Sequence, residues 1–351
     1  MQNPTGPVGV GLIGAGFIAG YHLDGLRAAG GAELRMIAGR NSQKTQALAA
    51  RYGIAATSSD WRSLLERDDI DAVVITTPDE THAEIAIAAA RAGKHILLQK
   101  PMARSSQECR AIIAAADAAK VHLQVSFMHR HFEEVVLARQ CLAEGAIGRP
   151  YSMRMRNATP GPDWGSWFYR RASVGGGVVM QLGIHGIDLL RHLFGEIESV
   201  SANTALLRKE RRLADGTIVQ PDNEDHALAL YWFSCGAMAT HEMSMSEVQG
   251  CDRFTLEIYG ERGTIWLRTG RGPLAIYSPQ QTGVSQWRVP TLPAREPGAR
   301  QHELFLDMVR GRIDPEPTAR DGLASVLVAE AIYRSSASRC EENPFAAEAR
   351  A

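Results

Sequence analysis

The chain has 351 residues, more than one ordinary hydrophobic core supports, and this length predicts two domains. Apolar residues make up 45% and charged residues 22% of the chain, a composition that excludes disordered and fibrous classes. Lys and Arg (38) nearly balance Asp and Glu (39), so no net charge attracts nucleic acid or an anionic membrane, and a small molecule is the expected ligand.

Cysteine usage and hydropathy bear on the compartment. The apolar segment from Val8 to Ala19 is not preceded by Lys or Arg, which argues against a signal peptide. We find no stretch of about 18 uncharged apolar residues, so we expect no membrane span. The cysteines are odd in number and lack metal-ligand or redox-motif spacing, which favours reduced thiols in a cytoplasmic protein. They are Cys109, Cys141, Cys235, Cys251 and Cys340.

The first 128 residues alternate short apolar runs with longer helical patterns. Runs this apolar are typical of strands buried on both faces. They are Val8 to Ile13, Leu34 to Ala38, Ala72 to Thr76, His95 to Leu98 and Leu123 to Phe127. Helix starts are indicated by Thr81 with Glu84 and by Ser105 with Glu108, both at capping-box spacing. The alternation predicts an α/β domain over residues 1–128, a doubly wound parallel sheet with helices on both faces.

The pattern changes near residue 129, where a second domain over residues 129–351 is expected to begin. Turns rather than helices separate its later strand candidates, so neighbouring strands should be antiparallel and the domain α+β. The strand candidates are Tyr151 to Asn157, Ala227 to Phe233, Ala237 to Met243, Phe254 to Tyr259 and Thr264 to Leu267. Helices are predicted over Glu133 to Glu144, Gln301 to Arg310 and Arg320 to Ser335.

A glycine-rich turn follows the first strand directly. Gly14 to Ala19 matches the dinucleotide-binding pattern G-x-G-x-x-G/A. Gly14 permits the tight turn, and Gly16 lets the backbone approach a pyrophosphate. With Phe17 and Ile18 the turn opens a helix, whose N-terminal N–H groups favour an anion. The position of this motif at the first strand of an αβ array predicts a dinucleotide site.

The residue expected to bind the adenosine ribose is not acidic. About 20 positions past the fingerprint, such sites commonly carry Asp or Glu, but here the second strand ends at Gly39, Arg40 and Asn41. The missing carboxylate removes repulsion against a 2′-phosphate, and Arg40 offers a planar cation. We therefore expect NADP to be favoured over NAD. The alternative is that Arg40 only stacks on adenine in an enzyme that uses either cofactor.

Three further segments carry a resemblance to a known family. They are Thr76 to His82, Gln99-Lys100-Pro101, and Gly175 to Asp188 with its glycine run. Together with the fingerprint, these segments make the chain resemble the Gfo/Idh/MocA oxidoreductase family over nearly its whole length. The resemblance implies a Rossmann domain and an open, largely antiparallel sheet with one face in oligomer contacts, in a homodimer or homotetramer. It also implies hydride transfer between a nicotinamide cofactor and a secondary alcohol or ketone carbon of a sugar, cyclitol or sugar derivative.

The resemblance implies roles for residues in two loops of the first domain, Thr76 to His82 and Gln99-Lys100-Pro101. Lys100 matches the catalytic lysine of the family's Glu-Lys-Pro motif, which contacts the reacting hydroxyl and the nicotinamide ribose. An ammonium group at such a sheet edge can stabilise a developing alkoxide and relay a proton. Gln99, also expected beside the cofactor, departs from the family's glutamate and cannot pair electrostatically with Lys100. The resemblance also implies Thr77 and Pro78 as nicotinamide or ribose contacts, and His82 as a cofactor-binding residue of the cofactor loop or the active-site rim.

The glycine run is followed by three polar residues at helical spacing. Gln181, His185 and Asp188 stand at i, i+4 and i+7, which puts them on one helical face. The resemblance makes His185 the proton-transferring histidine, with Gln181 where the family commonly has Asp or another polar residue. An amide can hydrogen-bond substrate but cannot raise the basicity of His185 as a carboxylate would, so Lys100 would carry more of the proton transfer. The alternative is a buried histidine that satisfies a backbone partner.

Substrate contacts are expected from aromatic residues and one arginine. Trp164 and Trp167 precede the glycine run, and aromatic faces suit the C–H faces of a sugar ring. An oligomer contact or a lid is an equal alternative for them. Arg130 resembles a family arginine near the substrate pocket. No metal is expected, because His129 and His131 provide only two imidazoles.

Two other functions remain open from the sequence. A redox-neutral glycosidase or lyase of the same fold would oxidise a sugar carbon transiently and then return the hydride. A ligand sensor would keep the fold without the chemistry. Lys100 and His185 argue against the sensor, whereas Gln99 and Gln181 keep it open.

Overall fold

The computed structural model describes residues 6–249, 252–314 and 318–346. The chain divides into two compact units, Met1–His131 with Ala294–Leu323 and Phe132–Pro293 with Ala324–Ala351. Four cysteines are free thiols, and Cys251 lies outside the described residues; the four are Cys109, Cys141, Cys235 and Cys340.

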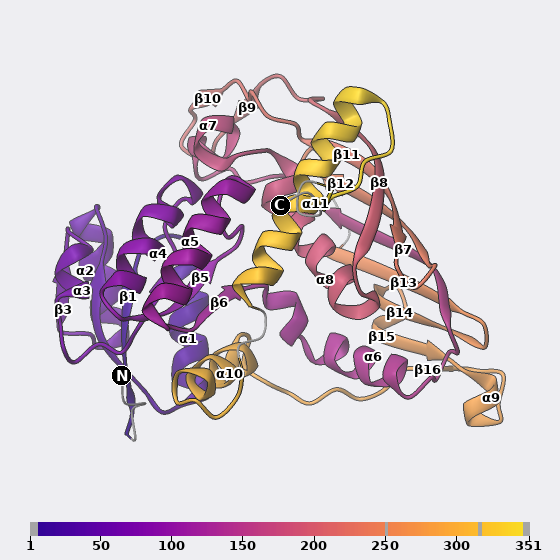
Figure 1. The fold of residues 1–351 in the computed structure, drawn as a ribbon, viewed down its shortest axis with the longest axis horizontal. Coiled ribbons are helices and arrows are strands. Elements are labelled where there is room, and N and C mark those ends of the chain that lie inside the picture. Colours follow the sequence, from indigo (N-terminus) through magenta and orange to yellow (C-terminus); the bar gives the residue numbers. More distant parts are fainter. Residues whose placement is uncertain (1–5, 250–251, 315–317, 347–351) are drawn as a thin grey trace. The chain divides into compact units, whose positions relative to one another are not determined.

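The first unit contains a six-stranded sheet in the order β3-β2-β1-β4-β5-β6 (Figure 1). Every neighbouring pair is parallel, so the prediction of a doubly wound α/β domain is confirmed. The strands are β1 (Val8–Ile13), β2 (Ala32–Ala38), β3 (Ala56–Ser58), β4 (Ala72–Ile75), β5 (His95–Gln99) and β6 (Leu123–Ser126). The order reverses between β1 and β4, and ligands of such sheets bind beyond the carboxyl ends of strands at this point.

Helices of the first unit mostly begin where the sequence predicts. They are α1 (Ala19–Ala29), α2 (Ser42–Tyr52), α3 (Arg62–Leu65), α4 (His82–Arg91), α5 (Ser106–Ala119) and α10 (Ala299–Val309). The Ser105 hydroxyl accepts a hydrogen bond from the N–H of Glu108, as its cap role requires. Thr81 occupies the N-cap position of α4, as predicted, but its side chain caps no backbone N–H. Its hydroxyl instead donates to the carbonyl of Pro78 at 2.8 Å, within the short 3₁₀ turn η1 (Asp79–Thr81).

Helix α10 lies with the first unit, which differs from the expected 129–351 domain. Its apolar face, including Phe305 and Leu306, belongs to the same core cluster as Leu23 and Leu26 of α1 and the apolar residues of β1. The helix returns to this unit because its hydrophobic face is buried against α1 rather than against the second sheet. Sequence periodicity identifies such a helix but not the sheet that it covers.

The second unit contains an eight-stranded sheet in the order β16-β15-β14-β13-β7-β12-β11-β8. All neighbouring pairs are antiparallel except β12 with β7, so the largely antiparallel sheet is confirmed. Its strands are β7 (Pro150–Ala158), β8 (Ile197–Ala205), β11 (His226–Phe233), β12 (Met238–Ser244), β13 (Phe254–Gly260), β14 (Gly263–Thr269), β15 (Gly272–Tyr277) and β16 (Trp287–Arg288), beside the small pair β9 (Arg211–Arg212) and β10 (Ile218–Val219). Its helices are α6 (Glu133–Ala143), α7 (Arg171–Val174), α8 (Ile184–Phe194), α9 (Pro279–Thr282) and α11 (Ala319–Ser338), the last of which begins in the first unit.

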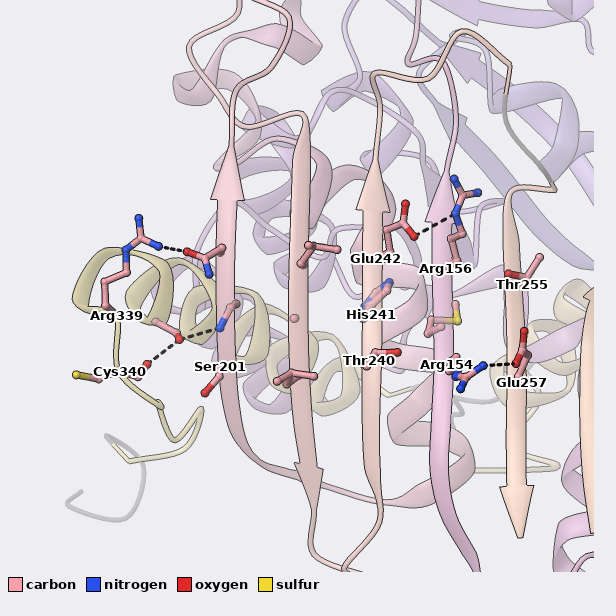
Figure 2. A pocket seen from close by; sticks show the side chains of 17 residues that line it. Arg154, Arg156, Ser201, Thr240, His241, Glu242, Thr255, Glu257, Arg339 and Cys340 are labelled. Atoms are coloured by element: carbon pink, nitrogen blue, oxygen red, sulfur yellow. Dashed lines mark hydrogen bonds and ion pairs between the residues drawn. The ribbon is translucent and has the colours of Figure 1, made fainter.

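Small residues bring α8 close to one face of this sheet. A Cβ atom added to Gly183 would lie 2.3 Å from the sulfur of Met243, and one added to Gly186 would lie 2.3 Å from Oδ1 of Asn157. The opposite face carries Thr240 and Arg156 (Figure 2). It is exposed, and Leu228 on β11 keeps 54% of its surface accessible. Buried and exposed residues therefore alternate along β11, as expected for a sheet covered on one face.

One described helical stretch, Arg171–Phe194, is long and apolar enough to cross a membrane by length and composition. The sequence led us to expect no membrane span. In the structure 94% of its apolar 18-residue segment is buried inside the protein. Packing against the second sheet therefore accounts for the apolar character of this helix.

Candidate active-site residues in the two units

The glycine-rich turn lies at the carboxyl end of β1, between the ends of β2 and β4. Gly14 donates its N–H to the carbonyl of Ala38 at 2.8 Å, and the hydroxyl of Thr76 donates to the carbonyl of Gly14 at 2.9 Å. Gly14 has a φ of +108°, and an added Cβ would lie 2.8 Å from backbone atoms of Thr76. Glycine is therefore required at position 14 both by conformation and by space.

The second glycine of the turn faces open space. A Cβ added to Gly16 would meet no described atom within 4 Å, and the next residue, Phe17, is exposed. Helix α1 follows at once, and Ile18 at its N-cap has no side-chain group that could accept a hydrogen bond. An open turn at a helix N-terminus without a side-chain cap fits a pyrophosphate, so these residues suit the dinucleotide that the motif predicts.

Packing around Gly39 at the end of β2 explains why this position has no carboxylate side chain. A Cβ added to Gly39 would lie 2.5 Å from the hydroxyl oxygen of Thr45 and 3.3 Å from Cβ of Ala15, so a side chain does not fit. The side chain of Asn41 caps helix α2, accepting a hydrogen bond from the N–H of Lys44 at 2.9 Å. Arg40 is exposed, as the predicted contact with the adenosine end of the cofactor requires.

His82 lies inside the first unit rather than on a rim, between the two loops that contain predicted cofactor contacts. Its ring is fully buried, with Nδ1 2.9 Å from the carbonyl oxygen of Pro101 and Nε2 3.0 Å from that of Thr77. The imidazole thus connects the loop after β4, which contains Thr77 and Pro78, to the loop after β5. The buried ring therefore holds these two loops together through its two nitrogens.

The Gln99-Lys100-Pro101 turn follows β5, at the same sheet edge as the cofactor turn. Lys100 is half-buried, whereas the Gln99 side chain is buried and accepts a hydrogen bond from the N–H of Lys100 at 2.8 Å. Its amide nitrogen lies 3.1 Å from Nε2 of His22 on α1. Gln99 therefore points into the unit rather than toward a bound cofactor, while Lys100 stays at the edge.

Arg130 is paired within the first unit. It lies in the short helix η2 (Met128–His131), is almost fully buried, and its guanidinium is 3.1 Å from a carboxylate oxygen of Asp321. The other oxygen of Asp321 accepts two hydrogen bonds from Thr318. Burial acts to raise the pKa of Asp321, but the Arg130 charge and these hydrogen bonds outweigh it and lower the pKa. This pairing gives Arg130 a structural role beside the predicted substrate contact.

Gln181, His185 and Asp188 are all buried in the second unit. The expected single helix is interrupted, because Val179–Gly183 forms a π-helical turn, η4, before α8 begins. Gln181 lies in this wider turn and His185 in the first turn of α8. The ordinary helical phase therefore does not relate the two residues, and π turns are frequent at functional sites.

Two residues that the sequence interpretation missed hold the start of this segment. One carboxylate oxygen of Glu224 accepts hydrogen bonds from the N–H of Gly177 (2.9 Å), the N–H of Val179 (3.2 Å) and the hydroxyl of Tyr333 (2.8 Å). A Cβ added to Gly177 would lie 1.8 Å from the Glu224 carbonyl oxygen, which explains the glycine there. Burial raises the pKa of Glu224, and the hydrogen bonds oppose that rise.

The aromatic residues form a compact group. The rings of Trp167 and Phe168 stack at 3.9 Å, and Trp164 meets Phe168 edge-on at 4.8 Å. Trp164 is about half exposed and Trp167 partly buried. An exposed aromatic ring on a preformed cluster is compatible with both the predicted sugar contact and an oligomer contact.

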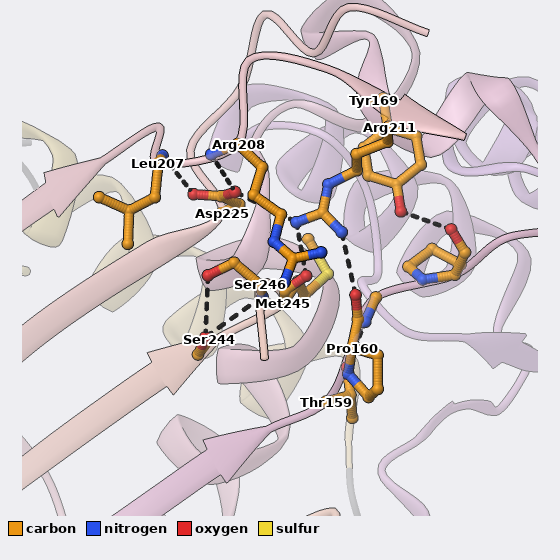
Figure 3. A network of polar contacts seen from close by, with 12 residues as sticks. Thr159, Pro160, Tyr169, Leu207, Arg208, Arg211, Asp225, Ser244, Met245 and Ser246 are labelled. Carbon is orange, nitrogen blue, oxygen red and sulfur yellow. Dashed lines mark hydrogen bonds and ion pairs between the residues drawn. The ribbon is translucent and has the colours of Figure 1, made fainter. Parts of the chain in front are cut away.

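A buried arginine fixes the loop that carries these rings, as Figure 3 shows. Arg211 donates to the carbonyls of Pro160 (2.9 Å) and Met245 (2.5 Å) and to the carboxylate of Asp225 (3.1 Å). Tyr169 stacks on the Arg211 guanidinium and donates its hydroxyl to the carbonyl of Pro162. Short-range patterns give no signal for this network, since its members are distant in sequence.

Comparison with known proteins identifies the chain. One family model, an oxidoreductase family with an NAD-binding Rossmann fold, matches residues 8–127, and a GFO/IDH/MocA C-terminal domain matches residues 135–266. A levoglucosan dehydrogenase from Pseudarthrobacter phenanthrenivorans is 30% identical over 96% of this chain and 97% of its own. The chain belongs to the Gfo/Idh/MocA family of oxidoreductases.

Other members of the Gfo/Idh/MocA family agree with this placement. A myo-inositol 2-dehydrogenase from Thermotoga maritima is 26% identical over 93% of this chain and 95% of its own. A solved levoglucosan dehydrogenase, in complex with NADH and levoglucosan, has a TM-score of 0.85 at 30% identity, over 96% of this chain and 99% of that one. These similarities confirm an oxidoreductase with an NAD-binding domain.

Proposed function

We propose that this oxidoreductase transfers a hydride between a nicotinamide cofactor and a secondary alcohol or ketone carbon of a sugar, cyclitol or sugar derivative. The observation that carries the proposal is that Lys100 follows β5 at the same edge of the sheet as the cofactor turn after β1. The names of the relatives, which include levoglucosan and inositol dehydrogenases, support this substrate class.

When bound, the nicotinamide accepts or donates the hydride. The Lys100 amine binds the reacting oxygen, stabilises negative charge that develops on it, and takes up or returns its proton. His185 contributes to substrate binding and proton transfer, with the Gln181 amide hydrogen-bonding the substrate. The exposed ring of Trp164 and the neighbouring Trp167 pack on the sugar.

Replacing the lysine tests this role. Lys100→Met keeps most of the side-chain volume but removes the amine, and turnover should fall at least about a hundredfold while cofactor affinity is largely kept. The assay follows nicotinamide absorbance with a panel of cyclitols, aldoses and glycosides. Near-parental turnover in the folded variant would remove Lys100 from the chemistry. Substrate conversion without net absorbance change would indicate a glycosidase or lyase, and cofactor binding without any turnover would indicate a sensor.

The Gln181→Asp variant tests the role of His185. A carboxylate near the imidazole favours its protonated form, so the acidic limb of the pH–rate profile for alcohol oxidation should move to higher pH. Gln181→Leu, which adds no charge, is the matched control. If the profile of Gln181→Asp overlays that of the parent, either the two side chains do not meet or His185 is not the titrating base.

We further propose that NADP binds at least as tightly as NAD. Arg40 is exposed at the carboxyl end of β2 and Lys44 in the first turn of α2, and Gly39 leaves no carboxylate there to repel a 2′-phosphate. Arg40→Ala should weaken NADP binding and leave NAD binding nearly unchanged, with Arg51→Ala as an exposed arginine control. A strong NAD preference that Arg40→Ala does not alter would contradict the proposal.

The exposed face of the second sheet is the surface that we propose for self-association, in a homodimer or homotetramer. On it Leu228 and Leu230 of β11 are exposed. Leu228 lies opposite Glu242 of β12, whose carboxylate is 3.3 Å from Arg156 on β7 (Figure 2). Interfaces between identical subunits are more apolar than the rest of a protein surface and are enriched in Arg, and this face offers both. Leu230→Glu should shift the mass measured by sedimentation toward the monomer. An unchanged mass would place the contact elsewhere.

A further inference from the structure

A chain of buried hydrogen bonds extends from the Lys100 turn into the first unit. The amide nitrogen of Gln99 lies 3.1 Å from Nε2 of His22, and Nδ1 of His22 lies 3.0 Å from Nε2 of His302 on α10. The remaining nitrogen, Nδ1 of His302, lies 2.7 Å from the carbonyl oxygen of Gly298. Both histidines are fully buried, so these contacts are not shared with solvent.

The groups at the two ends of this hydrogen-bond series, the N–H of Lys100 and the carbonyl of Gly298, determine the direction of every hydrogen bond between them. The N–H of Lys100 can only donate, so the oxygen of the Gln99 amide must face it and the NH₂ group must face His22. His22 therefore accepts at Nε2 and carries its proton on Nδ1. His302 in turn accepts at Nε2 and donates from Nδ1 to Gly298, whose carbonyl can only accept. Each of these hydrogen bonds then joins one donor to one acceptor with both imidazoles neutral.

The surroundings of the histidine pair favour that neutral state. Burial lowers the pKa of His22, helped by His302, and burial lowers the pKa of His302 to about 4. Tyr21 packs against both rings while its hydroxyl donates to Gln301, and His131 is close enough to interact electrostatically with His302. These neighbours are neutral, and no carboxylate contacts the pair among the described residues.

We propose that His22 and His302 are positioning residues for the Lys100 turn, and that they require an amide instead of a carboxylate at position 99. The importance of this for turnover rests on the proposed role of Lys100, but the hydrogen-bond direction does not. The geometry thus gives a reason for the departure at Gln99: this side chain is matched to the histidines behind it.

A carboxylate at position 99 would break the directional order. With Gln99→Glu, both carboxylate oxygens accept, so Nε2 of His22 must donate and its Nδ1 must accept from Nε2 of His302. A neutral His302 then has no proton on Nδ1, and that nitrogen faces the Gly298 carbonyl as one acceptor against another. The conflict is removed when the pair takes up one proton. Gln99→Glu should therefore contain a buried imidazolium that the parent lacks.

The direct test is ¹⁵N NMR of the ring nitrogens in protein labelled at histidine, with signals assigned by replacing His22 and His302 by Asn in turn. In the parent both rings should be neutral with the proton on Nδ1 at about pH 7. In Gln99→Glu one of them should show the imidazolium pattern at the same pH. Gln99→Met, which has similar size and no charge, should keep both rings neutral.

Kinetics connect this result to the Lys100 turn. The pH profile of hydride transfer should gain an ionisation in Gln99→Glu that the parent and Gln99→Met lack. A proton on Nε2 of His22 in the parent would overturn the proposal, as would two neutral rings in folded Gln99→Glu. The parent spectrum decides the hydrogen-bond direction even if Gln99→Glu does not fold. If no form turns over any sugar or cyclitol, the proposed function fails while the spectra still test the histidine pair.

Discussion

Glu224 provides a sharp test of how the segment with Gln181 and His185 is held. Glu224→Ala removes the acceptor of two backbone N–H groups and one hydroxyl. Each such hydrogen bond contributes about 0.5–1.5 kcal/mol, and buried donors left without a partner cost about 1–3 kcal/mol each. A local destabilisation of about 3–5 kcal/mol is therefore expected. Glu224→Gln keeps one acceptor oxygen and should cost about 1 kcal/mol.

Amide hydrogen exchange measures this effect where it arises. In Glu224→Ala the exchange of the Gly177 and Val179 amides should accelerate at least about a hundredfold, since 1.36 kcal/mol corresponds to a factor of ten. Tyr333→Phe removes only the hydroxyl and is the matched control, with an increase of about tenfold or less. Parental exchange rates at both amides in Glu224→Ala would refute the reasoning, because Glu224 would then not hold this segment.

Two further predictions concern acid stability and the cofactor turn. Burial lowers the pKa of His302 to about 4 and that of His241 to about 3, so both rings are neutral in the folded protein and take up protons on unfolding below about pH 6.5. The free energy of unfolding should therefore fall by about 1.4 kcal/mol per pH unit for each of them as the pH drops from 6.5 toward 4, and urea titrations with no such slope would contradict this. Gly14→Ala should destabilise the fold through its clash with Thr76, whereas Gly16→Val should leave thermal unfolding unchanged and weaken cofactor binding. Equal effects of the two substitutions on unfolding would contradict the conclusion that Gly16 faces open space while Gly14 is packed against Thr76.

Local patterns in the sequence were sufficient for the first sheet. The apolar run Val8 to Ile13 coincides with β1, because a parallel strand buried on both faces must be apolar throughout. The fingerprint turn was also predictable, since a positive φ at Gly14 and the open space at Gly16 are local requirements of that turn. The short edge strand β3 has no comparable apolar run and was missed.

Interactions between distant residues could not be predicted in this way. Asn41 occupies a helix cap and His82 joins two loops, and the sequence indicated neither contact. At Gly39 the structure adds a packing reason to the proposed cofactor preference, because Thr45 leaves no room for a side chain there. Each of these outcomes depends on a partner that only the folded chain brings near, and the hydropathy pattern contains no information about it.

The most direct test of the proposed function is transfer of isotope from substrate to cofactor. Cyclitols and aldoses deuterated at their secondary alcohol carbons are incubated with the protein and oxidised NADP or NAD, and the reduced cofactor is analysed by mass spectrometry. We predict one deuterium in the reduced nicotinamide with the parent, and loss of that transfer with Lys100→Met. Conversion of these substrates with no deuterium in the nicotinamide, or undiminished transfer by Lys100→Met, would contradict the account.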